Sequence, residues 1–341
     1  MAEGRWYNRS QRMRKYLPFI LLVFLGIIFI ATRFYNISSL PLFTDEAIYV
    51  RWSQIARFDA GWRFISLTDG KQPSFVWLTM IVMRFVQDPL LAGRLVSVGA
   101  GFLSMIGIFF LGKELFKSKW VGIISSTLYI IFPMALVYDR MALYDSLVGI
   151  FTIWGLYLEV LLVRKLRLDI ALLLGMVIGG GVLTKTSAFF NIYLLPTTLL
   201  LFQFRKEWQS KFVKWLLLAT LVVISAYVYY SVLRLSPFFH IVNEKNSIFV
   251  YPLHDWLGHP FEFFKGNILG QWDWFVKYVT WPVIFLMVGS LFVYRRFTKE
   301  KLLLLVWFAA PFVALALFGR VLYPRFILFM ILPLLPLAAL S

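Results

Sequence analysis

The stretch YLPFILLVFLGIIFIAT, residues 16–32, decides the fold class, because it has no charged side chain and follows a basic segment. A helix needs ~20 mostly apolar residues to cross the ~30 Å hydrocarbon core of a bilayer. We therefore expect this stretch to span a membrane. Phe34, Tyr35 and Asn36 follow it where a signal peptide would have small residues at its cleavage site, so we expect a retained anchor.

Nine further apolar runs of similar character follow along the chain. They occupy residues 95–112, 120–138, 146–163, 170–183, 187–204, 215–233, 278–294, 302–318 and 326–340. The sequence therefore predicts an all-α polytopic membrane protein with about ten spanning helices. No internal repeat or linker divides the chain, so we expect one transmembrane domain over residues 1–341.

Composition agrees with a lipid environment. Sixty per cent of the residues are hydrophobic and 15% are charged, which is too apolar for a soluble domain of this length. The net charge of +17 does not indicate nucleic acid, because the basic residues are scattered between apolar runs. With no cysteine, the chain has no disulfide and no thiolate metal site.

The apolar run 74–86 is short and contains Arg84, and its placement determines the sidedness of everything after it. If this run does not cross, five basic segments lie on one face, and they hold much of the chain's positive charge. They are residues 12–15, 113–119, 164–167, 205–214 and 295–301. The positive-inside rule makes that face cytoplasmic. We therefore expect residues 74–86 to form a juxtamembrane helix on the outer face. This helix lies within the first of two long outer loops, residues 34–94 and 234–277.

The first outer loop contains two candidate functional positions. Asp45 and Glu46 follow Thr44 at the start of a helical pattern. Acids in a first turn favour the helix dipole, but a carboxylate held above the bilayer can also deprotonate an acceptor hydroxyl. Lys71 lies in a turn before the juxtamembrane helix and is either a solvated loop residue or a cation for a phosphate.

Other candidates lie in short outer turns. Asp139, Arg140 and Asp145 lie between two spans, where charges either pair with one another or serve a site. Lys185 follows a glycine-rich span and either extends to the membrane surface or, with Arg325, binds an anionic head group. The histidines match no compact zinc motif, so we expect no metal site from these residues, predict no cofactor, and leave a divalent metal requirement open.

The order of these motifs resembles the type-C membrane glycosyltransferases, and especially the protein O-mannosyltransferases and lipid A aminoarabinose transferases. The shared order is an outer-loop Asp-Glu, a Lys-x-Pro before a short apolar helix, an Arg-Leu opening a span, an Arg followed by an Asp, a Leu-Thr-Lys turn and an aromatic-Pro-Arg-aromatic stretch. In this chain these motifs are Asp45-Glu46, Lys71-Gln72-Pro73, Arg94-Leu95, Arg140 with Asp145, Leu183-Thr184-Lys185 and Tyr323-Pro324-Arg325-Phe326.

The resemblance implies inverting transfer of a sugar from a polyprenyl-phosphate donor to a protein, lipid or glycan acceptor on the extracytoplasmic face of a prokaryotic inner membrane. It implies that Asp45 is the general base, with Glu46 beside it and Asp145 as a second acid. It also implies that Lys71 contacts the donor phosphate, and that Arg325 and Tyr323 lie near the lipid phosphate. Asp139, Arg140 and Lys185 complete the expected substrate-binding set, with no nucleic-acid partner.

Two departures from the family pattern are visible. Gln72-Pro73 stands where the family usually has two prolines, and relatives commonly carry further helices or an outer domain, so the chain is either a shortened form or a minimal member. The alternative function is a transporter or lipid flippase. Transporters place ionisable groups at the centre of the membrane, whereas here Glu159 is the one acid clearly inside an apolar run. A non-catalytic assembly protein of the envelope is a third possibility.

Overall fold

A computed structural model describes residues 2–204, 207–259 and 261–341, with side chains from Tyr16 onward. The α-helices are α1 (Ala2–Phe34), α2 (Thr44–Phe58), α3 (Ser74–Val82), α4 (Pro89–Phe116), α5 (Lys119–Ile131), α6 (Pro133–Tyr138), α7 (Tyr144–Lys165), α8 (Leu168–Val182), α9 (Phe190–Leu194), α10 (Trp208–Ser231), α11 (Ile241–Phe249), α12 (Leu253–Gly258), α13 (Phe264–Val279), α14 (Trp281–Phe292), α15 (Thr298–Phe318), α16 (Leu328–Ile331) and α17 (Leu335–Ala338). Short 3-10 turns are η1 (Ile37–Ser39), η2 (Ala60–Trp62), η3 (Ile65–Asp69), η4 (Thr186–Phe189), η5 (Leu195–Leu201), η6 (Val232–Leu235), η7 (Arg295–Phe297), η8 (Pro324–Ile327) and η9 (Leu332–Leu334).

All ten predicted apolar runs are largely helical, but they differ in continuity. Among the described residues, five helices are long and apolar enough to cross a membrane, or six if α13 and α14, which meet at a 99° bend, form one span. Four shorter apolar segments, 119–131, 168–182, 186–201 and 324–338, account for most of the remaining runs. Prolines explain part of this shortening, because Pro133 opens a new helix after Phe132, and Pro333 and Pro336 divide the last run into turns.

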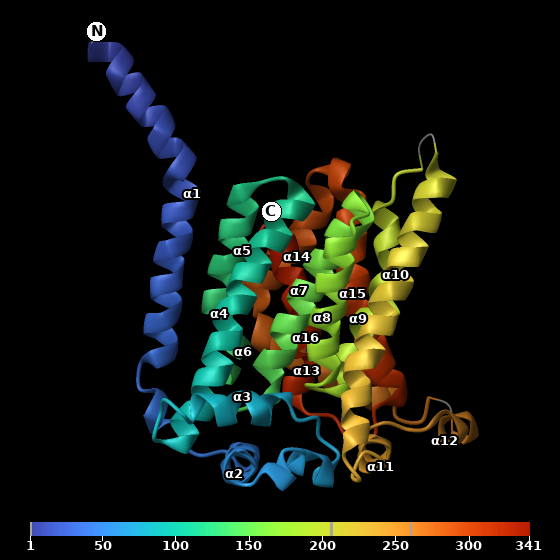
Figure 1. Cartoon of the computed structure of the whole chain (residues 1–341). Helices are drawn as coiled ribbons and strands as arrows, with labels where there is room; N and C mark the ends of the chain where they lie inside the picture. Colours follow the sequence, from blue (N-terminus) through green and yellow to red (C-terminus); the bar gives the residue numbers. More distant parts are fainter. Residues whose placement is uncertain (1, 205–206, 260) are drawn as a thin grey trace.

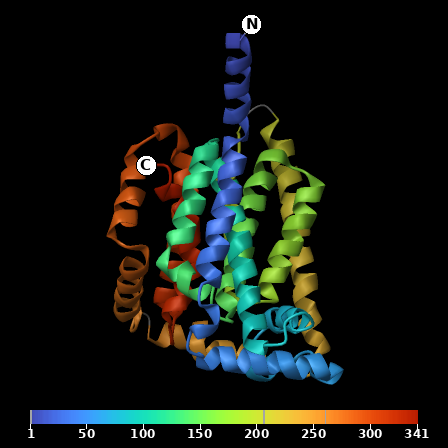
Figure 2. The same cartoon turned by 90° about the vertical axis from the view of Figure 1, so that its left-hand side faces the viewer.

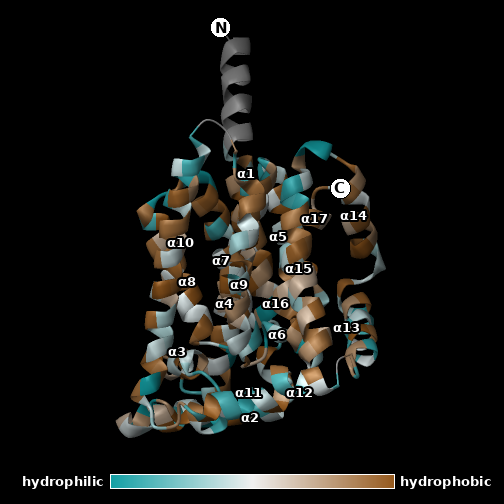
Figure 3. Ribbon diagram, turned by 90° about the vertical axis from the view of Figure 1, so that its right-hand side faces the viewer, coloured by the Kyte–Doolittle hydropathy of each residue, from teal (hydrophilic) through white to brown (hydrophobic). Residues whose placement is uncertain are grey.

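The long helices stand side by side as a bundle, and the elements of the two long loops gather at one of its ends (Figure 1). The helices α2, α3, α11 and α12 all lie at this end, while the basic connections lie at the opposite end, as the side view also shows (Figure 2). The α3 helix lies across the end of the bundle, as expected for a juxtamembrane helix, although it ends at Val82, four residues before the predicted limit. Apolar residues cover much of the sides of the bundle (Figure 3).

Small residues allow the spans to pack closely. A Cβ atom added at Gly175 would lie 2.6 Å from Ser225 Cβ, and one added at Gly179 would lie 2.6 Å from Tyr229 Cγ. Both contacts join α8 to α10, and small residues spaced four apart typically allow such close packing. The α8 and α10 helices therefore form a rigid pair, and Lys185 follows the end of α8.

The arrangement predicts which positions share a face of the membrane. We expect an impermeant thiol reagent applied to intact cells to label cysteine introduced at the exposed residue Ser247, in α11, but not at the exposed residue Ser210, in α10. The chain has no native cysteine to interfere. Permeabilised cells, in which both variants should react, provide the control. Labelling of Ser210→Cys in intact cells would contradict the proposed sidedness.

Candidate active site

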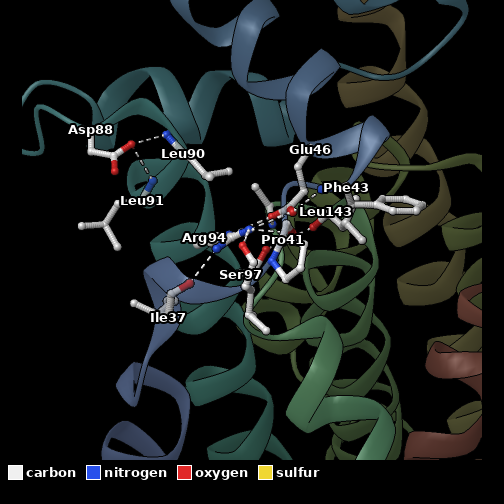
Figure 4. Close-up of polar contacts among 12 residues, drawn as sticks. Ile37, Pro41, Phe43, Glu46, Asp88, Leu90, Leu91, Arg94, Ser97 and Leu143 are labelled. Atoms are coloured by element: carbon white, nitrogen blue, oxygen red, sulfur yellow. Dashed lines mark hydrogen bonds and ion pairs between the residues drawn. The ribbon is translucent and has the colours of Figure 1, made fainter.

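The start of α2 is fixed by a buried ion pair. The Arg94 guanidinium in α4 donates from Nε to Glu46 Oε1 and from Nη2 to Glu46 Oε2, both at 3.0 Å (Figure 4). Glu46 also accepts the backbone N–H of Phe43 at 3.1 Å and that of Ala142 at 2.7 Å. Both charged side chains are fully buried. Glu46 therefore joins α2 to α4 and to the turn before α7, and its oxygens face these partners.

Asp45 points the other way, toward the last part of the chain. The helix begins at Thr44 with Phe43 as its cap residue, so Asp45 and Glu46 both lie in its first turn. Asp45 forms an ion pair with Arg325 of η8, and Tyr49, one turn further along α2, donates its hydroxyl to Asp45 Oδ2 at 3.4 Å. Asp45 keeps 20% of its side chain exposed, so this carboxylate is accessible where Glu46 is not.

A second acid meets the same arginine. Asp145 lies in the first turn of α7, and its Oδ2 lies 3.8 Å from Arg325 Nε. Its Oδ1 accepts a hydrogen bond from Lys185 Nζ at 2.8 Å. Burial lowers the pKa of Lys185, and the charge of Asp145 opposes that shift. Two acids and two cations from four separate segments thus converge at the end of the bundle that holds α2 and α3.

Arg325 is only partly satisfied by these contacts. Its Nε and Nη1 atoms are buried and have no hydrogen-bond partner among the described residues. Its guanidinium carbon lies 5.7 Å from the ring centre of Phe43 and 5.6 Å from that of Tyr323. Buried donors without acceptors are costly, so this guanidinium is suited to an anionic ligand.

Lys71 lies beside this cluster and has its own carboxylate. Its Nζ lies 3.1 Å from Asp69 Oδ2 and 4.9 Å from the ring centre of Tyr49. Lys245 of α11 pairs with the other oxygen of Asp69. Burial of Asp69 raises its pKa, but hydrogen bonds from Lys245 and Lys71 outweigh burial and hold the pKa below its usual value. Asp69 is therefore ionised at neutral pH and links the two long loops.

The backbone around Lys71 is held by both neighbouring segments. Gly70 has a φ of +65°, and a Cβ atom there would lie 2.4 Å from Lys245 Cβ. Gln72 donates to Thr186 Oγ1 at 2.8 Å, and the Thr186 hydroxyl donates to Asn246 Oδ1 at 3.2 Å. Gln72, at the position where the family pattern has proline, therefore holds the first loop against η4 and α11.

Two predicted site residues, Asp139 and Arg140, lie apart from the acids and cations at Arg325, whereas the ring of Tyr323 lies beside that guanidinium. Asp139 is fully buried and accepts hydrogen bonds from Tyr129 and Ser146, with Arg33 as its ion-pair partner. Arg140 donates to the backbone oxygen of Tyr35 and pairs with neither nearby acid. Tyr323 is half exposed.

The sequence did not indicate three residues that contact the predicted site residues, namely Tyr49, Arg33 and Lys245. Tyr49 lies one helical turn from Asp45, so the i, i+4 spacing was a usable signal. Arg33 lies at the end of the first span, and Lys245 in a long loop, and neither stands in a recognisable motif. The described residues contain no group of three or more His, Asp or Glu side chains placed to hold a metal ion.

The chain is similar to one known protein family and to several solved membrane-protein structures. Residues 70–230 match the sequence profile of the family described as dolichyl-phosphate-mannose-protein mannosyltransferase. No curated protein matches the sequence. Among solved structures, ArnT from Cupriavidus metallidurans in the apo state is 16% identical with a TM-score of 0.62, over 99% of this chain and 60% of that one. The apo oligosaccharyltransferase of Archaeoglobus fulgidus is 14% identical with a TM-score of 0.58, over 96% of this chain and 50% of that one.

The fold is that of the type-C membrane glycosyltransferases. The structural matches show that the chain shares this fold, and its long apolar helices indicate an integral membrane protein. The chain spans about half to three fifths of the length of the structures that it matches. ArnT has also been solved with undecaprenyl phosphate, and the A. fulgidus enzyme, AglB, with an inhibitory peptide and dolichol-phosphate.

The buried pair at the start of α2 gives a stability prediction. Arg94→Met should destabilise the protein by about 3–5 kcal/mol, because it leaves the Glu46 carboxylate buried without a counter-ion. The control is Arg167→Met, which removes an exposed pair with Asp169 and should leave thermal stability nearly unchanged. The measurement is thermal unfolding in detergent. Equal melting of the two variants would show that the buried pair does not hold the fold.

Proposed function

We propose that this protein is an inverting glycosyltransferase that uses a polyprenyl-phosphate-linked sugar on the extracytoplasmic face. The observation that carries the proposal is the convergence of Asp45 and Asp145 on Arg325, whose guanidinium has two buried donors without a hydrogen-bond partner in the described part of the chain. Such a site offers a base and an anion-binding group within one side chain's length of each other. The acceptor class stays open among protein, lipid and glycan.

In this mechanism Asp45 is the general base. Its carboxylate takes the proton from an acceptor hydroxyl while the acceptor oxygen bonds to the anomeric carbon of the sugar. The bond between that carbon and the phosphate oxygen breaks, and polyprenyl phosphate leaves as an anion. Inversion follows because acceptor and leaving group occupy opposite faces of the sugar ring.

Cations at the site stabilise the leaving phosphate. Arg325, Lys185 and Lys71 would contact it, and a preorganised positive group in a low-dielectric site stabilises developing charge strongly. Phosphate binding would compete with Asp45 for Arg325 and so free Asp45 Oδ2 to accept the proton. Asp145 would then hold Lys185 and Arg325 in place.

Glu46 and Asp139 have positioning roles in this proposal. Glu46 sets the direction of Asp45 because all of its contacts fix the first turn of α2. Asp139 fixes the start of α7 through Ser146, next to Asp145. Neither side chain has an accessible oxygen for proton transfer, since both are fully buried.

Replacement of the base provides the direct test. Asp45→Asn should lower the rate of sugar transfer by about 10²–10⁴, because the amide keeps the size of the carboxylate but cannot take a proton. The measurement is the initial rate with purified protein and a panel of polyprenyl-phosphate sugars, with thermal stability followed on the same sample. Asp255→Asn, an exposed acid of the second outer loop, should transfer normally. Near wild-type transfer by a stable Asp45→Asn protein would end the assignment.

The phosphate contact gives a separate test. Lys71→Ala should reduce turnover by about 10²–10³, the usual cost of removing one preorganised donor. Lys265→Ala, an exposed lysine of α13, is the matched control and should have no effect. Binding of the donor should weaken in parallel, as measured by displacement of a labelled polyprenyl phosphate. Unchanged turnover and donor binding would show that Lys71 serves only to fix the loop.

A further inference from the structure

A cavity lies beside the proposed active site, at the same end of the bundle. It has a volume of about 300 Å³ and is lined by residues 40–43, Val137, Arg140 and Met141. Apart from Arg140, these side chains are apolar. The volume is at the lower end of the ~300–1,000 Å³ range of small-molecule sites. An apolar chamber with a single cation suits a ligand that has an anionic head and a hydrocarbon part.

Arg140 has no carboxylate partner among the described residues. Its Nη2 donates to the backbone oxygen of Tyr35, and its Nε is buried without a hydrogen-bond partner. Burial lowers the pKa of Arg140, and the nearby charges of Arg33 and Arg94 add to that effect. Arg33 forms an ion pair with Asp139, and Arg94 forms one with Glu46. Of these three arginines, Arg140 is therefore the one whose charge no carboxylate of the described residues neutralises.

The cavity adjoins the proposed catalytic site but is separate from its cations. Phe43 lines the cavity, and its ring centre lies 5.7 Å from the guanidinium carbon of Arg325. Arg325, Lys185 and Lys71 do not line the cavity. An anion bound at Arg140 would thus be a second anion, present in addition to the phosphate of the sugar donor.

The position of the cavity indicates which amphiphile occupies it. The lining residues Leu42 and Val137 are 57% and 50% exposed, so the cavity opens on the outer surface of the bundle where the spans end. The phosphates of bilayer lipids are concentrated at this depth, and their chains continue into the hydrocarbon. A glycerophospholipid can therefore reach Arg140 with its phosphate while its chains pass beside Val137.

We propose that Arg140 and this apolar cavity bind one anionic glycerophospholipid of the bilayer. The lipid would pack against residues 40–43, the segment that leads into α2. It would thereby brace the segment before the catalytic acid without taking part in transfer. The proposal concerns lipid binding and does not depend on the transfer activity proposed above.

The test is lipid retention measured without any enzyme assay. Protein purified from nanodiscs that contain phosphatidylcholine and phosphatidylglycerol is analysed by native mass spectrometry. Wild type should retain one phosphatidylglycerol more than Arg140→Gln. The apparent affinity of Arg140→Gln should be about five- to tenfold lower, as expected for one lost charge-assisted contact at a membrane surface. Arg140→Lys keeps the charge and should retain the lipid better than Arg140→Gln, which separates binding from a folding defect.

Arg51→Gln is the control, because Arg51 is an exposed arginine of α2 at the same end of the bundle. It should retain lipid as the wild type does. Equal retention by wild type and Arg140→Gln would overturn the proposal. It would also be overturned if undecaprenyl phosphate displaced the bound phosphatidylglycerol one for one, because the cavity would then belong to the lipid carrier.

Discussion

The buried pair between Glu46 and Arg94 is the interaction on which the rest of the site depends. A charge in a low-dielectric interior is tolerated only when its partners satisfy it, and here they do so fully. Arg94 also donates to the backbone oxygens of Ile37, Leu40 and Pro41, so one guanidinium holds the whole segment between α1 and α2. With that segment fixed, the first turn of α2 has one orientation, and Asp45 faces Arg325.

Much of this architecture could be predicted because hydrocarbon imposes simple rules on sequence. The apolar runs, the juxtamembrane placement of α3 and the gathering of Asp45, Lys71, Asp145, Lys185 and Arg325 at one end follow from hydropathy and charge placement. The sequence could not predict that Glu46 is buried in an ion pair while Asp45 stays accessible. Adjacent residues on a helix point in different directions, and only tertiary packing decides which one is buried.

Ion pairs between residues far apart in the sequence could not be predicted from sequence patterns either. The pairing of Asp139 with Arg33 joins two spans, whereas the neighbouring Arg140 was the nearer candidate in sequence. Helix lengths were overestimated for a related reason. Hydropathy records apolar runs but not their breaks, and the 99° bend between α13 and α14 follows from the backbone at Thr280, where φ is +69°.

The opposite end of the bundle has a different electrostatic design. Arg164 of α7 bridges Glu114 of α4 and Glu300 of α15 at 2.8 and 3.0 Å, so one arginine between two carboxylates ties three spans together there. At the candidate site Arg325 instead keeps two buried donors without a hydrogen-bond partner among the described residues. Arg164 is therefore occupied by acids of the chain itself, whereas Arg325 is prepared for a charge that a ligand brings.

The close approach of Gly70 to Lys245 has a consequence for protein engineering. A side chain at Gly70 would collide with α11, and Asp69 holds both lysines across the same junction. The first loop, the turn at Thr186 and α11 therefore form a single interlocked module. A chimera that exchanges only one of these segments with a related protein would place unmatched side chains at this junction, so the three segments are best moved together.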